Sequence, residues 1–291
     1  MIQVTSPEYN FSKHGDIAFV PTMGNLHEGH LNLIKAAKLE SCFVIVSIFI
    51  NPLQFNNAND LINYPKSIEA DIKLLEAAGC DLAFIPEETI LNDIDSIQAS
   101  EQSNVLCGKS RPGHFDGVLT IVNRLFTIID PKIAFFGLKD YQQFILIKNY
   151  TTQHYPNLLI KGVPTTRDIS GLALSSRNNL LNPHELDLAA NIFKELCLIK
   201  TNFSLNKIDL LASEAKKNLE KLGFDIDYLD YLDGLSLKKI NSSTSIIIIA
   251  IAVRLGQIRL IDNIIVNLSL IHISEPTRQE AISFGGVGVE K

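Results

Sequence analysis

Residues 17–50, IAFVPTMGNLHEGHLNLIKAAKLESCFVIVSIFI, decide the fold. An apolar run at 17–20 is followed by a glycine-containing loop and by a stretch at 31–39 whose apolar residues have helical spacing. A second uninterrupted apolar run covers 42–50. Continuous apolar strands separated by a helix are typical of a parallel sheet that is covered on both faces. We therefore expect a strand–helix–strand unit here.

The same alternation continues beyond this unit. Amphipathic helices are predicted at 66–78, at 117–130 and from about residue 140, and apolar strands at 81–85, 133–136 and near 158–160. This pattern predicts a doubly wound, Rossmann-like α/β sheet of about five parallel strands. We assign it to a first domain, residues 1–166.

The pattern changes after Arg167. Helices are expected from Pro183 and over 205–222, but the strands at 227–232 and 245–253 are not separated by a helix. We expect a smaller α+β domain over 167–267. The final stretch, 268–291, matches neither pattern, and we expect it to be a disordered tail or sequence that does not belong to the native gene.

Composition excludes several classes of protein. The 291 residues are 46% hydrophobic and 20% charged, which is a globular balance. A net charge of −6 does not favour a nucleic-acid-binding face. No apolar run reaches the roughly 18 residues of a membrane helix, and the N-terminus lacks signal-peptide order. Four widely spaced cysteines are expected to be reduced, three of them buried. We expect a cytoplasmic protein with neither nucleic acid nor membrane as a partner.

Two histidines, His27 and His30, lie between the first strand and the first helix. Three residues apart at a helix start, they point the same way, beside unpaired N–H groups that favour an anion. Ligands of open α/β sheets bind at this end of a strand, and Gly24 and Gly29 would let the backbone approach one closely. The pattern favours nucleotide binding. The alternatives are a pair of ordinary loop histidines and a metal site, for which the HEGH spacing is unsuitable.

Further polar segments follow other strands. Gly137 and Lys139 follow the fourth strand, where a lysine can oppose phosphate, although this segment taken alone favours a plain turn with a solvated lysine. The consecutive Ser175, Ser176 and Arg177 can wrap a triphosphate with donors, or merely cap a helix.

Two amides, Asn51 and Gln54, follow the second strand, and uncharged amides suit hydroxyls and a carboxylate. Turn chemistry alone would also explain Asn-Pro here and Pro-Gly in the segment 111–115. Arginine is scarce, with 7 against 19 lysines, yet Arg111, Arg167 and Arg177 fall in such loops. A bidentate fork for carboxylate or phosphate would explain their placement, and chance would also explain it.

Five segments together resemble one family. PTMGNLHEGH (21–30), SIFINPLQF (47–55), SRPGHFDGV (110–118), FGLKDYQQ (136–143) and LALSSRN (172–178) occur in the order found in the pantothenate synthetases (pantoate–β-alanine ligases), which are HIGH-type nucleotidylyltransferases. The resemblance covers about residues 15–267. It implies a Rossmann-like N-terminal domain, a smaller C-terminal domain that acts as a lid, and a homodimer.

The resemblance also implies an activity and a set of site residues. The reaction would be the ATP-dependent condensation of (R)-pantoate with β-alanine to pantothenate, through pantoyl adenylate, with Mg²⁺ accompanying ATP. His30 is the family's assigned acid. The other implied catalytic residues are His27, Lys139, Ser175, Ser176 and Arg177. ATP would contact Met23, Gly24, Asn25, Leu26, His27, Glu28, Gly29, His30, Gly137, Leu138, Lys139, Asp140, Thr166, Leu174, Ser175, Ser176 and Arg177. Pantoate would contact Gln54, Gln143 and Asn51.

Three departures and two alternatives accompany the resemblance. Leu138 stands where the family usually has an acidic residue, the segment before the first strand is short, and the tail after Asn267 has no counterpart in the family. Another HIGH-type adenylyltransferase, acting on phosphopantetheine or nicotinamide mononucleotide, would lack the NPLQF and RPGHF segments. A catalytically inactive nucleotide-binding or scaffold protein would have lost the histidines, Lys139 or the SSR triplet.

Overall fold

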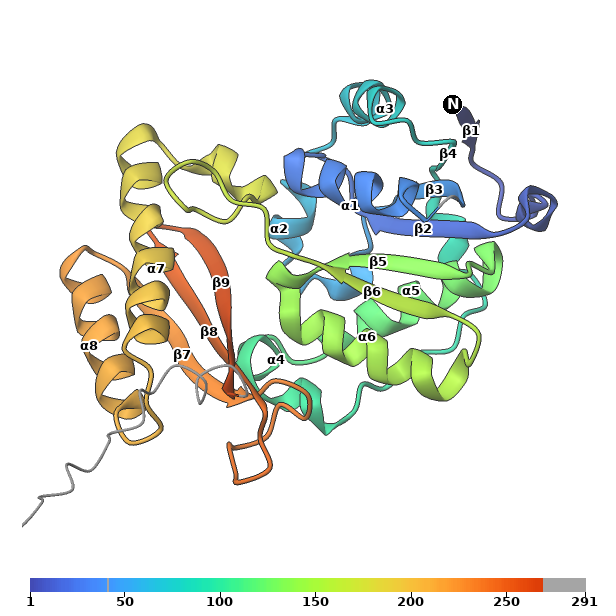
Figure 1. Cartoon of the computed structure of the whole chain (residues 1–291). Helices are drawn as coiled ribbons and strands as arrows, with labels where there is room; N and C mark the ends of the chain where they lie inside the picture. The colour runs from blue at the N-terminus through green and yellow to red at the C-terminus, as the bar shows by residue number, and fades with distance from the viewer. Residues whose placement is uncertain (41, 269–291) are drawn as a thin grey trace, which may run out of the picture.

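The computed structural model describes residues 1–40 and 42–268, which form two sheets (Figure 1). The larger sheet is parallel throughout and has the strand order β1-β4-β3-β2-β5-β6. Its strands are β1 (Ile2–Val4), β2 (Ile17–Thr22), β3 (Phe43–Ile48), β4 (Leu82–Phe84), β5 (Ile133–Gly137) and β6 (Leu159–Val163). The predicted doubly wound α/β class is confirmed.

The strand count differs from the sequence prediction by one. The sheet has six strands rather than about five, because β1 adds an edge strand beside β4. This strand is three residues long, and Ile2 and Gln3 are exposed. A short edge strand without a continuous apolar run has no periodicity from which it could have been predicted.

Helices cover both faces of the large sheet. On one face α1 (Glu28–Lys38) and α3 (Ile68–Ala77) pack on Ala18 and Val20, and on the other α5 (His114–Ile129) and α6 (Tyr141–His154) pack on Phe19. Successive strand residues point to opposite faces, so a strand covered on both sides is apolar throughout. The loops carry two short helices, α2 (Ala58–Ile62) and α4 (Leu106–Ser110).

The strands β2 and β5 separate at their carboxyl ends. The register between β2 and β3 covers all six residues of β2, whereas the register between β2 and β5 covers Ala18↔Ile133 and Phe19↔Ala134 and ends there. The helices that follow these strands lead in opposite directions, α1 toward β3 and α6 toward β6. This is the topological switch point of the sheet, where α/β proteins bind ligands.

The C-terminal part contains α7 (Pro183–Thr201), α8 (Ile208–Lys221) and an antiparallel sheet of β7 (Asp225–Asp233), β8 (Ile246–Leu255) and β9 (Ile258–Asn267). Strand β8 is apolar on both faces. Ile249 and Ile251 pack toward α7 and α8, whereas Ile248 and Ala250 join the core of the first domain. The boundary at 166/167 and the lid role stay predictions, and residues 269–291 of the expected tail lie outside the described part.

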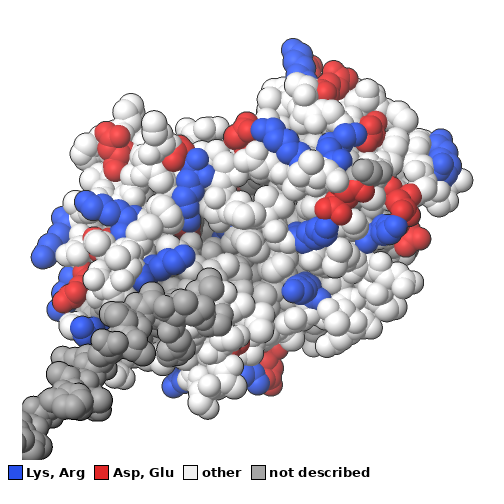
Figure 2. Space-filling view, viewed as in Figure 1, with Lys and Arg blue, Asp and Glu red and all other residues white. Residues whose placement is uncertain are grey.

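The surface view in Figure 2 shows Lys and Arg interspersed with Asp and Glu over the face drawn. Across residues 1–40 and 42–268, no helix has the length and apolar character needed to cross a membrane. All four cysteines are free thiols, but only Cys80 is buried, so the expectation of three buried cysteines was wrong. Cys42 and Cys197 are partly open to solvent.

Gly117 brings helix α5 into direct contact with the loop after β3. A Cβ atom at Gly117 would lie 2.2 Å from the carbonyl oxygen of Leu53, and the Asn51 side chain donates a hydrogen bond to the Gly117 carbonyl at 3.0 Å. The glycine is required because a side chain would push the loop, and with it Gln54, away from the helix.

Substitution Gly117→Ala tests this contact. Alanine in a helix is ordinarily favoured over glycine by about 1 kcal/mol, but here we expect a lower free energy of unfolding because the methyl group collides with backbone. Denaturant unfolding measures it, with Gly137→Ala as the control, since a Cβ at Gly137 meets nothing within 4 Å. Equal or greater stability of Gly117→Ala would contradict the contact.

Candidate active site

A cavity of about 280 Å³ opens at the switch point and is closed on one side by the C-terminal domain. Its wall takes residues from the ends of β2 and β5, the start of α1, the connection after β6 and strand β9. Fifteen of the predicted site residues line it: Met23, His27, Gly29, His30, Asn51, Gln54, Gly137, Lys139, Asp140, Gln143, Thr166, Leu174, Ser175, Ser176 and Arg177. Segments that are far apart in the chain are thus brought together.

Five predicted ATP contacts lie outside the cavity wall: Gly24, Asn25, Leu26, Glu28 and Leu138. Glu28 forms an exposed ion pair with Lys35. The Leu138 side chain packs beside Gly162, as a Cβ on that glycine would lie 2.5 Å from it, so an apolar residue suits this position.

Asp71 of α3 explains the conformation of the loop before α1. Its buried carboxylate accepts hydrogen bonds from the backbone N–H groups of Asn25 and Leu26, both at 2.8 Å. Gly24 has a φ of +80°, and a Cβ there would lie 2.9 Å from Asp71 Oδ2. The glycine therefore serves the packing against Asp71. No sequence pattern indicated this role, because Asp71 belongs to a charged amphipathic helix.

The two histidines cap helix α1. His27 is the N-cap residue, and its Nδ1 accepts a hydrogen bond from the N–H of Gly29 at 3.1 Å. The N–H of His27 in turn donates to Nδ1 of His30 at 3.3 Å. Because each Nδ1 is an acceptor, the hydrogen of each neutral ring is assigned to Nε2. The histidine rings thus accept hydrogen bonds from backbone N–H groups at the start of α1, and their Nε2–H groups are the donors that remain for a ligand.

Burial keeps both rings neutral. Burial, together with the positive charge of Lys139, lowers the pKa of His27 to about 4. Burial, with contributions from His27 and Lys139, lowers the pKa of His30 to about 3. At pH 7 the site therefore presents two neutral N–H donors near one ammonium group. Within residues 1–40 and 42–268, no carboxylate forms an ion pair with Lys139. This charge distribution suits a polyanion.

Amide side chains lie at another part of the wall. Asn51 is buried and donates to the Gln54 side-chain oxygen at 3.2 Å, and Gln54 Nε2 contacts Met23 Sδ at 2.9 Å. Apolar residues of α5, including Val118 and Val122, line the cavity beside them. An apolar surface with a few amides suits a small hydroxy acid.

The three loop arginines have different partners. Arg167 forms a bidentate ion pair with the buried Asp262 at 2.6 and 2.8 Å, so its fork holds a carboxylate of the protein and not of a ligand. Arg177 reaches Asp60 at 3.3 Å across an exposed surface. Arg111 forms no ion pair with a carboxylate of the described residues.

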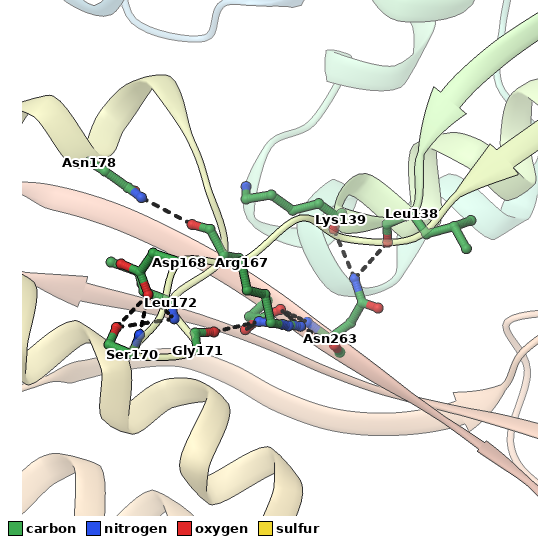
Figure 3. A network of polar contacts seen from close by, with 11 residues as sticks. Leu138, Lys139, Arg167, Asp168, Ser170, Gly171, Leu172, Asn178 and Asn263 are labelled. Carbon is green, nitrogen blue, oxygen red and sulfur yellow. Dashed lines mark hydrogen bonds and ion pairs between the residues drawn. The ribbon is translucent and has the colours of Figure 1, made fainter. Parts of the chain in front are cut away.

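Strand β9 holds the backbone of the lysine loop (Figure 3). The buried Asn263 side chain donates to the carbonyls of Leu138 at 2.9 Å and Lys139 at 2.8 Å. Next to it, Asp262 binds Arg167, which also donates to the carbonyl of Gly171. The C-terminal domain therefore fixes the place of Lys139. A polar Asp-Asn pair inside the apolar run 258–266 was a signal of this role that the sequence-based prediction did not use.

Comparison with known proteins identifies the family. A family model described as pantoate-beta-alanine ligase matches residues 3–265. The chain belongs to this family. The ligase of this family from Aliivibrio fischeri, a pantothenate synthetase, is 42% identical over 260 residues, covering 87% of this chain and 89% of that protein. The resemblance drawn from five segments is confirmed.

Solved structures of family members agree with the fold. The pantothenate synthetase of Thermus thermophilus superposes with a TM-score of 0.84 at 34% identity, over 91% of this chain and 99% of that one. The pantoate-beta-alanine ligase of Francisella tularensis, solved with beta-gamma ATP and beta-alanine, gives a TM-score of 0.77 at 38% identity, over 91% of this chain and 97% of that one.

The histidine pKa values predict a pH-dependent stability. Below about pH 6.5 the unfolded chain takes up a proton at position 30, whereas the folded protein does not until pH approaches 3. The free energy of unfolding should therefore fall as the pH drops from 6.5, by up to about 1.4 kcal/mol per pH unit for this group. In His30→Gln the fall measured by denaturant unfolding should be shallower. An unchanged slope in His30→Gln would refute the assignment.

The substitution Asn263→Ala tests the link between the domains. Loss of both hydrogen bonds from the Asn263 side chain should lower the free energy of unfolding by about 1–3 kcal/mol. It also frees the Lys139 loop, so we expect a lower kcat in an assay of ATP consumption. Asn202→Ala, whose amide bonds only its own helix, is the control. Wild-type kcat in Asn263→Ala would show that the lysine does not depend on β9.

Proposed function

We propose that this chain joins (R)-pantoate and β-alanine in an ATP-dependent reaction that passes through pantoyl adenylate. The observation that carries the proposal is that one cavity combines donors for a polyphosphate with an amide-lined apolar wall for a hydroxy acid. Membership of the ligase family supports the reaction, and so does the Francisella relative's complex with beta-gamma ATP and beta-alanine.

In the first step a carboxylate oxygen of pantoate attacks the α-phosphorus, and the bond to the leaving pyrophosphate breaks. Gln54 and Gln143 would hold pantoate, with Asn51 keeping Gln54 in place. His27 and His30 would donate from Nε2 to the phosphates. Since His30 is neutral at pH 7, it would stabilise the developing charge as a hydrogen-bond donor, without first becoming a cation.

In the second step the neutral β-alanine amine attacks the acyl carbon of the adenylate, AMP leaves with the electron pair of the broken C–O bond, and the nitrogen releases a proton to solvent. Pyrophosphate leaves in the first step and AMP in the second. The groups that hold the phosphates must therefore release pyrophosphate before they release AMP. Ser175, Ser176 and Arg177 would hold the nucleotide throughout. Ser176 contacts the carbonyl of Asn25 at 3.4 Å, which places this loop against the histidine loop. The enclosed position shields a reactive adenylate from water.

Magnesium would enter as the Mg²⁺–ATP substrate. Residues 1–40 and 42–268 contain no cluster of three potential metal-ligating side chains, and the two carboxylates on the cavity wall are Asp140 and Asp262. Asp262 is already paired with Arg167. Mg²⁺ usually keeps several waters and binds mainly through substrate phosphates, so Asp140 alone fits as a protein contact.

We also propose a homodimer in the cytoplasm, which analytical ultracentrifugation and fractionation would test.

The direct test is the substrate dependence of the two products. Pyrophosphate release from ATP should require pantoate, and AMP should appear only when β-alanine is added. Pyrophosphate release without pantoate would refute the proposal.

Lys139→Ala tests the phosphate-binding role within this reaction. Removing the ammonium group should lower adenylate formation, measured as pantoate-dependent ATP–pyrophosphate exchange, by about 10²-fold or more, as removal of one preorganised electrostatic contact does elsewhere. The circular dichroism spectrum should be unchanged. Lys217→Ala on the exposed face of α8 is the control, and near-wild-type exchange in Lys139→Ala would exclude the role.

A further inference from the structure

Arg111 has an unusual environment for an arginine. Its guanidinium donates to the carbonyl oxygen of Gln54 at 3.1 Å and contacts Nε2 of His114 at 3.2 Å. Nδ1 of His114 lies 2.8 Å from the same carbonyl and can only donate to it, so Nε2 is an acceptor for Arg111. Both partners are neutral, because burial lowers the pKa of His114 to about 4. The guanidinium is thus rigidly held but not neutralised.

The other cations on the cavity wall are engaged or already assigned. Arg259 binds Asp227 at 2.6 Å, and Arg177 reaches Asp60. Lys139 is proposed to bind phosphate. Among the described residues of this wall, Arg111 is therefore the guanidinium that has neither a carboxylate partner nor a proposed ligand. Burial lowers its pKa, and the charges of Arg177 and Arg259 contribute, which means that an anion bound here would relieve a repulsion.

A side pocket of about 40 Å³ adjoins the main cavity at this point. Arg111, His114, Lys139 and Gln143 line both spaces, and so do the carboxylates Asp140 and Asp262, of which Asp262 is already paired with Arg167. One water needs about 10–15 Å³ of such volume, so the pocket has room for about three water-sized atoms. A carboxylate group has three non-hydrogen atoms and is therefore of this size. Arg111 also contacts the backbone of Gln54, whose side chain is proposed to hold pantoate, so the pocket lies near a residue that would hold the acyl substrate.

From this arrangement we propose that Arg111 binds the carboxylate of the amine substrate, so that its amino group points at the acyl carbon of the adenylate. The inference rests on the proposed function and extends it by assigning the residue that selects an amino acid over a simple amine. His114 acts through Arg111 as a positioning residue. Its fixed tautomer and the Gln54 carbonyl hold the guanidinium in a single orientation.

The test compares two nucleophiles that differ only in charge, β-alanine and β-alaninamide. In the wild type, kcat/KM should be much greater for β-alanine. In Arg111→Gln we expect the ratio of the two kcat/KM values to fall by about 10- to 100-fold, as expected for one hydrogen-bonded charged contact. Reaction of β-alaninamide should change little. A general disturbance of the site would lower both rates and leave the ratio unchanged, so an unchanged ratio would overturn the proposal whether or not the variant is less active.

Two further measurements separate this proposal from its neighbours. Pantoate-dependent ATP–pyrophosphate exchange does not involve the amine. If this exchange is absent in the wild type, the proposed function fails. If it is present while the ratio of kcat/KM values for the two amines is unchanged in Arg111→Gln, only this inference fails. Arg259→Gln should keep the wild-type ratio because its charge is already paired with Asp227. A collapse of the ratio in Arg259→Gln, and not in Arg111→Gln, would assign the carboxylate to the other arginine.

Discussion

The limited pairing of β2 with β5 is the constraint on which the site depends. The two strands pair over Ala18↔Ile133 and Phe19↔Ala134, and then their following helices lead to opposite sides of the sheet. The separation leaves the ends of both strands facing one space, with His27 and His30 on one side and Lys139 on the other. Neutral ring donors and an ammonium group are thereby placed around one cavity although they come from different elements.

Strand β9 of the second domain holds two loops of the site in place. Asn263 of β9 holds the carbonyls of Leu138 and Lys139, while Asp262 binds Arg167 at the start of the connection that carries the serine–arginine loop. Both side chains are buried beside an apolar contact between β8 and the first domain. Such a buried, fully partnered network gives orientation more than stability. In this chain the position of the C-terminal sheet is therefore part of the geometry of the site around Lys139.

The class of fold could be predicted from the sequence because it depends on local patterns. Polar loops after strands indicated some of the polar residues of the cavity wall, and the family resemblance supplied others. Continuous apolar strands, helical spacing and polar loops after strands are visible without any knowledge of distant contacts. The edge strand β1 was missed because a strand of three residues, of which Ile2 and Gln3 are exposed, carries no period. The backbone N–H groups of Asn25 and Leu26 donate to Asp71, 45 or more residues away, and no local signal records such a bond. Likewise, sequence alone could not decide that the fork of Arg167 meets a protein carboxylate while Arg111 has neutral partners.

A structure of the protein bound to a non-hydrolysable ATP analogue and pantoate would test the central claim most directly. We predict phosphate oxygens within hydrogen-bond distance of Nε2 of His27 and His30 and of the Lys139 ammonium, with pantoate between Gln54 and Gln143. The cap hydrogen bonds at both Nδ1 atoms should persist. Phosphates bound away from the start of α1, or pantoate outside the amide-lined wall, would contradict it.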